Sequence, residues 1–86
     1  MKHREQLQRI IQHYGKENQM LKAVEESTEL SLALQHHWSG KAGKSEVITE
    51  IADMMILCNQ MALLFGESEV ELEIDRKIKR TIKRMN

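Results

Sequence analysis

The stretch Glu25-Glu26-Ser27-Thr28-Glu29 is followed later in the chain by Glu50-Ile51-Ala52-Asp53, and the rest of the sequence is organised around these acidic segments. Each segment holds two carboxylates three residues apart, and residues at that spacing are neighbours on one face of a helix. Two facing helices would bring four carboxylates together, and that much negative charge requires a cation between them. Because oxygen ligands favour hard divalent ions, the sequence predicts a site made of Glu26, Glu29, Glu50 and Asp53.

Size and composition favour one small helical domain that spans residues 1–86. The chain has no proline, 4 glycines and many helix-forming residues. Its formal net charge is zero, so the total charge indicates neither nucleic acid nor membrane as a partner. The single cysteine, Cys58, excludes an intrachain disulfide and a cysteine-based zinc site, and its apolar neighbours predict a buried thiol.

The hydropathy pattern predicts a cytoplasmic protein without membrane contact. The N-terminal segment is polar, which argues against a signal peptide. The longest apolar-rich run, Ile51–Phe65, contains Asp53, Asn59 and Gln60. At that length the run is too short to span a bilayer.

Apolar residues at helical spacing predict four helices, and no segment has the alternation expected of a strand. Gly15 and Gly66 are predicted to end helices, whereas Ser45 and Ser68 are predicted to cap the helices that follow them. The predicted helices cover residues 2–13, 18–37, 46–65 and 68–84.

The third predicted helix is apolar nearly all round, which is typical of a buried helix. A monomer of 86 residues can hardly surround such a helix, so we expect a homo-oligomer, either a dimer or a tetramer. The fourth predicted helix is acidic in its first half and basic in its second. Its expected inner face is the stripe Val70, Ile74, Ile78 and Ile82.

The acidic pairs also fit a simpler interpretation. A single Glu-x-x-Glu pair is common on solvated helix faces, so surface acids remain the alternative to a metal site. A di-iron bundle would need Glu-x-x-His pairs, which the chain lacks. A phosphate-binding loop at Gly40–Ser45 is excluded, because its glycines are too close together and a helix precedes it.

Glu-Glu-x-x-Glu followed by Glu-x-x-Asp resembles the signature of the MazG-like all-α nucleoside triphosphate pyrophosphohydrolases, whose relatives include dimeric dUTPases and phosphoribosyl-ATP pyrophosphohydrolases. Leu30 after the first motif, Trp38 at the end of its helix and the basic segment Lys77–Arg84 agree with this resemblance, which covers roughly residues 12–85. Thr81 and Met85 depart from the family pattern at positions that contact substrate in relatives.

The resemblance implies a four-helix MazG-like bundle, assembled as a homo-oligomer, that cleaves a nucleoside triphosphate to the monophosphate and pyrophosphate. Clearing unwanted nucleotides from the cellular pool is the implied role. The implied cofactor is Mg²⁺, or Mn²⁺, held by the four carboxylates, with Glu25 orienting the attacking water. The implied substrate-binding residues are Lys77, Arg80 and Arg84 for phosphate, Asn59 for sugar or base, and Trp38 for base stacking.

Each of these residues also has a structural interpretation. The cations match the helix dipole at a solvated helix end, Glu25 fits a surface acid, Asn59 fits a buried and satisfied amide, and Trp38 fits packing under the loop. The alternative for the whole chain is a non-catalytic helical module for regulation or interaction. A nucleic-acid binder that uses the basic last helix is disfavoured, because the same helix begins with acids.

Overall fold

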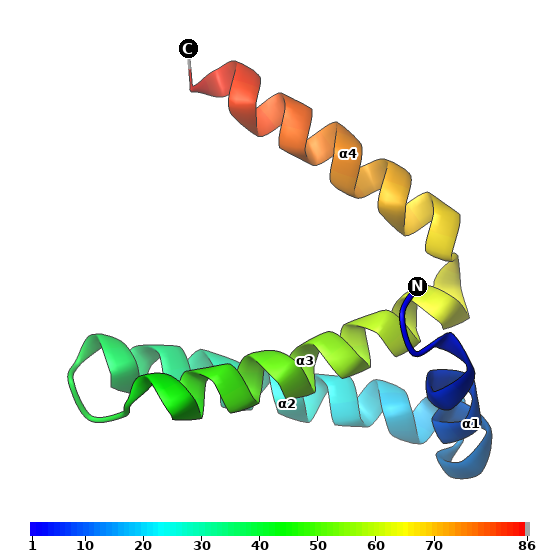
Figure 1. The fold of residues 1–86 in the computed structure, drawn as a ribbon, viewed down its shortest axis with the longest axis horizontal. Helices are drawn as coiled ribbons and strands as arrows, with labels where there is room; N and C mark the ends of the chain where they lie inside the picture. The colour runs from blue at the N-terminus through cyan, green and yellow to red at the C-terminus, as the bar shows by residue number, and fades with distance from the viewer. Residues whose placement is uncertain (86) are drawn as a thin grey trace.

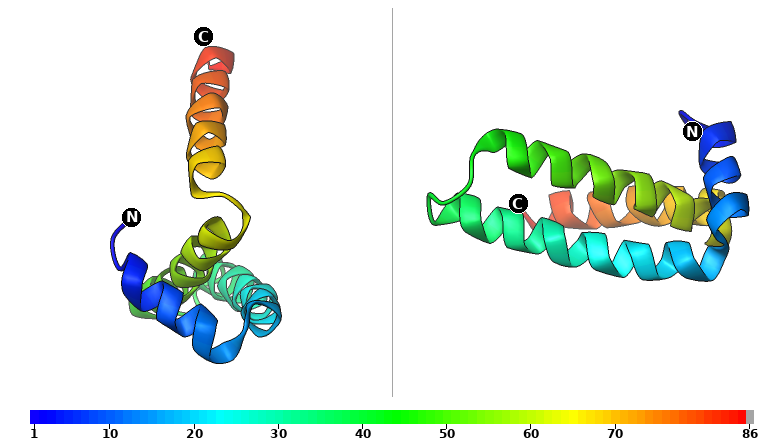
Figure 2. Two further views of the ribbon diagram at one scale, coloured as in Figure 1. Left: turned by 90° about the vertical axis from the view of Figure 1, so that its right-hand side faces the viewer. Right: turned by 90° about the horizontal axis from the view of Figure 1, so that it is seen from below.

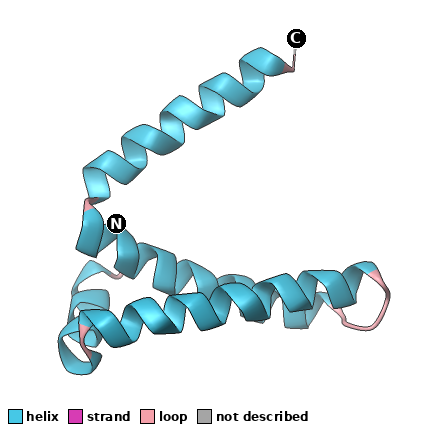
Figure 3. Ribbon diagram, turned by 180° about the vertical axis from the view of Figure 1, so that it is seen from behind, coloured by secondary structure: helices cyan, strands magenta, loops and turns pink. Residues whose placement is uncertain are grey.

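The computed structural model describes residues 1–85, which form four helices and no strand (Figures 1 and 3). This confirms the all-α prediction, with each helix boundary within two residues of its predicted place. The helices are α1 (Arg4–Tyr14), α2 (Lys16–Trp38), α3 (Lys44–Phe65) and α4 (Glu67–Arg84).

Glycines separate the helices as predicted, but the predicted serine caps are wrong. Gly15 lies between α1 and α2 at φ 89°, and Gly66 lies between α3 and α4 at φ 135°. α3 begins at Lys44 and α4 at Glu67, so Ser45 and Ser68 lie inside their first turns. The cap positions are occupied by glycines, which offer no side-chain hydrogen bond.

α2 and α3 form an antiparallel hairpin, and α1 lies across its open end (Figures 1 and 2). The tight connection at the other end is held by backbone hydrogen bonds, among them Lys41 N–H to the carbonyl of His36 at 2.7 Å. Leu7 of α1 and Leu57 and Ala62 of α3 are the buried apolar side chains of the described residues. The hydrophobic core therefore sits where α1 meets the hairpin.

α4 leaves this core and projects away from the hairpin (Figure 1). Its first residue, Glu67, forms an ion pair with Arg4 of α1 at 2.6 Å, which ties the start of α4 to α1. None of the residues of Glu67–Arg84 is buried. The predicted four-helix bundle is therefore not closed within one chain, and the expected inner stripe of α4 is exposed.

α3 is also less covered than its apolar sequence predicted. Ile51, Met55 and Ile56 are exposed, and Cys58, which we expected to be buried, is exposed as well. The helix extends beyond Ile51–Phe65, and by length and composition it is long and apolar enough to cross a membrane. A core helix of a soluble protein has the same length and composition.

Candidate metal centre

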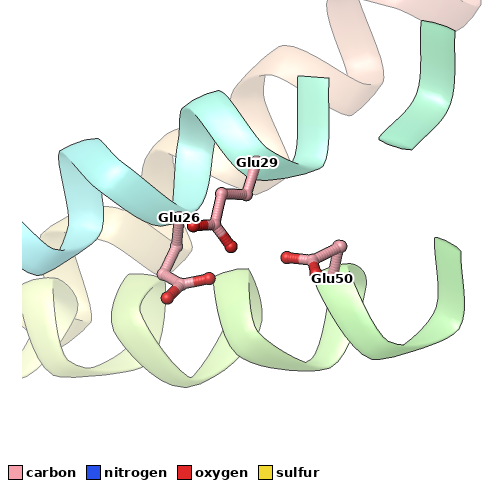
Figure 4. A group of neighbouring side chains, drawn as sticks. All are labelled: Glu26, Glu29 and Glu50. Atoms are coloured by element: carbon pink, nitrogen blue, oxygen red, sulfur yellow. The ribbon is translucent and has the colours of Figure 1, made fainter. Parts of the chain in front are cut away.

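Three of the four predicted carboxylates converge between α2 and α3 (Figure 4). Glu26 and Glu29 lie one turn apart on α2, and Glu50 reaches toward them from α3. One carboxylate oxygen from each residue lies within 4.8 Å of the other two. The Glu-x-x-Glu spacing places both α2 carboxylates on the face that the hairpin turns toward α3. We call Glu26, Glu29 and Glu50 the acidic cluster.

The carboxylates of the acidic cluster differ in burial. Glu26 is only 6% exposed, Glu50 is half-buried and Glu29 is exposed. One oxygen of Glu26 (Oε2) and one of Glu50 (Oε2) are buried with no hydrogen-bond partner among the described residues. A buried carboxylate oxygen without a partner is costly. Such oxygens are the donors that a hard cation would satisfy.

The pKa of Glu50 reflects the burial of its carboxyl group and the other carboxylates close to it. Burial raises the pKa of the Glu50 carboxyl above its usual value, and the charges of Glu29, Asp53 and Glu26 raise it further. The metal-free arrangement thus opposes ionisation of Glu50. A divalent cation would reverse the sign of that local field.

Lys22 also belongs to the site, although the sequence patterns did not single it out. Its Nζ lies 3.4 Å from Oε1 of Glu26 and 3.9 Å from a carboxylate oxygen of Glu25. A hydrogen bond to Glu26 raises the pKa of Lys22, and the nearby carboxylates add to the effect. The spacing of four residues between Lys22 and Glu26 was the available signal, since such pairs meet on a helix.

Asp53 and Glu25 lie at the margin of the acidic cluster. Asp53 is half-buried and outside the set of three converging residues, but its charge acts on Glu50. The four-carboxylate site is thus assembled only in part. Glu25 also lies outside the cluster, and its side chain is 66% exposed. This exposure fits a surface acid and also leaves the Glu25 carboxylate open to a water molecule.

A cavity of about 450 Å³ opens beside two of the clustered carboxylates, Glu29 and Glu50. Its volume lies within the range usual for small-molecule sites. Glu46 and Thr49 of α3 line it but were not among the predicted site residues. The full lining consists of Glu29, Leu32, Ala33, His36, Glu46, Thr49 and Glu50.

The predicted substrate-binding residues are not gathered at the acidic cluster within one chain. Lys77, Arg80 and Arg84 are exposed on α4, which projects away from the hairpin (Figure 1). Trp38 is 92% exposed at the end of α2, so it neither packs under the loop nor lines the cavity. Asn59 is half-buried on α3 and also lies outside the cavity lining.

The donor set of the acidic cluster fits a hard divalent cation. Three carboxylates supply oxygen ligands only, and no histidine or cysteine belongs to the converging group. Mg²⁺ usually takes a few carboxylates and keeps several waters, whereas zinc prefers nitrogen and sulfur. Comparison of the chain with family models, curated proteins and solved structures finds no match.

Proposed function

We propose that the chain is a Mg²⁺-dependent nucleoside triphosphate pyrophosphohydrolase of the MazG-like kind, with Mn²⁺ as a substitute ion. The observation that carries the proposal is the convergence of Glu26, Glu29 and Glu50 from two helices. Buried, unpartnered oxygens on Glu26 and Glu50 add to it. The ordered pair of acidic motifs in an all-helical chain supports the same chemistry.

The protein residues would act mainly by positioning. Bound Mg²⁺ would neutralise the triphosphate and lower the pKa of a bound water. Glu26 is held in place by burial and by Lys22, which fixes one side of the site. Glu29 and Glu50 would complete the oxygen ligands, and Asp53 would join them or hold their waters. Glu25 would orient the attacking water from the solvent side of α2.

In this proposal, the cationic side chains that bind phosphate do so in the homo-oligomer rather than within one chain. α4 carries Lys77, Arg80 and Arg84 away from the acidic cluster of its own chain. We therefore assign these cations to triphosphate bound in the assembled protein, where α4 lies against another copy. The same assembly would cover the exposed apolar residues of α3. Two acids within that helix, Glu50 and Asp53, favour an aqueous protein over a membrane span, and we propose a cytoplasmic location.

The test is product analysis with purified protein, Mg²⁺ and a panel of standard and modified nucleoside triphosphates. We expect monophosphate and pyrophosphate. Glu26→Gln and Glu50→Gln should each lower turnover at least about 100-fold, because both residues belong to the acidic cluster that would bind the ion. Asp53→Asn should lower turnover about 10–100-fold, the usual loss for a residue at the margin of a metal site. Glu5→Gln, a matched exposed acid on α1, should have no effect. Release of orthophosphate, or no turnover of any triphosphate, would contradict the proposal.

A non-catalytic helical interaction module is the second candidate, favoured by the exposed apolar residues of α3 and α4. In that case the carboxylates would be surface acids, and the folded protein would be indifferent to divalent ions. Melting the protein with and without Mg²⁺ separates the candidates. A rise in melting temperature with Mg²⁺ supports the metal site, and an unchanged value supports the module.

A further inference from the structure

α4 is the largest element of the described chain without a packing partner. It is an 18-residue helix with no buried residue, and it meets the other described helices only at its start, beside the end of α3 and through the ion pair of Glu67 with Arg4 of α1. In proteins, most of the stability of a helix comes from packing of its apolar face rather than from intrinsic helix propensity. The exposed apolar face of α4 consists of Val70, Ile74, Ile78 and Ile82, between 38% and 56% exposed. We call this set the α4 stripe.

In α4, the apolar residues of the stripe are spaced symmetrically about Arg76, and the charges on its two sides are opposite in sign. Val70 and Ile82 each lie six residues from Arg76, and Ile74 and Ile78 each lie two residues from it. The charges are opposite on the two sides of the same point. Acids precede Arg76, at Glu67, Glu69, Glu71, Glu73 and Asp75, whereas bases follow it, at Lys77, Lys79, Arg80, Lys83 and Arg84.

We infer that the partner of α4 is the α4 helix of a second copy of this chain, packed antiparallel about a two-fold axis at the level of Arg76. In this register Ile74 of one copy lies level with Ile78 of the other, and Val70 lies level with Ile82. The acidic half of each helix lies beside the basic half of its partner. A two-fold interface of this kind is self-complementary, as closed dimers require.

Charge complementarity distinguishes this arrangement from its competitors. A parallel pair would place acids beside acids and bases beside bases, which is unfavourable. Folding of α4 onto its own hairpin would have to reverse the direction set at Gly66 and work against the ion pair that ties Glu67 to Arg4. The antiparallel pair keeps both the chain direction at Gly66 and the ion pair between Glu67 and Arg4. This interface does not depend on the proposed metal chemistry, and it assigns the oligomer contact to named residues.

Thiol crosslinking of the full-length chain tests the register. In a Cys58→Ser background, which removes the one native thiol, one chain carries Val70→Cys and a second carries Ile82→Cys. The two positions lie twelve residues apart, which is about 18 Å along a helix. With a thiol-specific crosslinker shorter than that distance, mixing the two chains should give a covalent dimer. Each chain alone should give little, because its thiols lie at opposite ends of the paired helices.

Two further variants keep the test specific. Ile78→Glu, added to both crosslinking chains, places a charge at the centre of the stripe and should abolish the mixed dimer. Leu72→Glu is the matched control, since Leu72 is an exposed apolar residue of α4 outside the stripe, and the mixed dimer should persist. Circular dichroism confirms that every variant stays helical. Equal crosslinking of the single chains, no crosslinking in the mixture, or equal effects of both substitutions would overturn the inference.

Discussion

Nζ of Lys22 lies 3.4 Å from one carboxylate oxygen of Glu26, while the other oxygen of that carboxylate is buried without a partner among the described residues. Lys22 therefore balances only one side of the most buried acid in the chain. The unpartnered oxygen belongs to the residue that forms the acidic cluster with Glu29 and Glu50. In the proposed function this is the side on which Mg²⁺ binds.

Lys22→Gln should destabilise the metal-free protein, because Glu26 loses the cation that contacts it among residues 1–85. The loss of melting temperature should be smaller at saturating Mg²⁺, since the bound ion takes over part of the charge balance. Thermal denaturation of both proteins with and without Mg²⁺ measures the difference. An identical loss under the two conditions would mean that Lys22 and the proposed ion do not act on the same carboxylate.

Glu50→Gln should stabilise the metal-free protein and remove its response to Mg²⁺. The pKa of Glu50 is raised in the folded state, so the folded chain binds more protons than the unfolded chain in the interval above the usual carboxyl pKa. The free energy of unfolding of the metal-free protein should therefore fall as pH rises through that interval.

Denaturant unfolding at a series of pH values checks this dependence, which Glu50→Gln should flatten. Glu25→Gln is the control, because Glu25 is exposed and outside the acidic cluster. It should keep both the pH dependence and the Mg²⁺ response of the parent protein. If Glu50→Gln instead lowers the stability of the metal-free protein, the crowding described for the cluster is wrong.

Gln60→Met should raise the free energy of unfolding by about 1 kcal/mol, because it removes an unsatisfied buried acceptor and keeps the volume nearly the same. Gln60 is 1% exposed, and its Oε1 has no hydrogen-bond partner among the described residues. Gln8→Met, at an exposed position of α1, should change stability by less than about 0.5 kcal/mol. A clear destabilisation by Gln60→Met would show that the amide is paired in the assembled protein.

Gly66→Ala should lower the free energy of unfolding by about 1–3 kcal/mol, the usual cost of a non-glycine residue held in a sparsely populated backbone region. Gly66 has φ 135°, and an added Cβ would also displace the Glu69 carboxylate. Gly43→Ser is the matched control, because Gly43 caps α3 with extended backbone and open space around it. Serine there should stabilise the protein by a few tenths of a kcal/mol. Equal effects of the two substitutions would contradict the strain assigned to Gly66.

The helices were predictable because glycines and apolar spacing act locally. Gly15 and Gly66 end their helices as predicted, since a positive φ at those positions suits glycine. The prediction of serine caps was wrong because Gly43 and Gly66 occupy the cap positions, so the two helices begin one or two residues earlier than predicted. The place of α4 was not predictable, since an amphipathic pattern shows that one face needs cover but does not identify what covers it.

The acidic cluster was predictable in part. The spacing of Glu26 and Glu29 on one helix face depends only on helix geometry, and the hairpin then brings Glu50 to them. Asp53 stays at the margin because its position relative to α2 depends on how the two helices are rotated against each other, which spacing alone does not determine. The roles of Lys22 and Gln60 depend on burial, which only the packed structure reveals.

Binding of Mn²⁺, followed by the electron paramagnetic resonance signal of the free ion, tests the central claim most directly. The parent protein should remove Mn²⁺ from solution, excess Mg²⁺ should displace it, and Glu25→Gln should bind like the parent. Glu29→Gln and Glu50→Gln should each weaken binding at least about 100-fold. No binding by the parent protein, or equal weakening by Glu25→Gln and Glu50→Gln, would contradict a metal site at Glu26, Glu29 and Glu50.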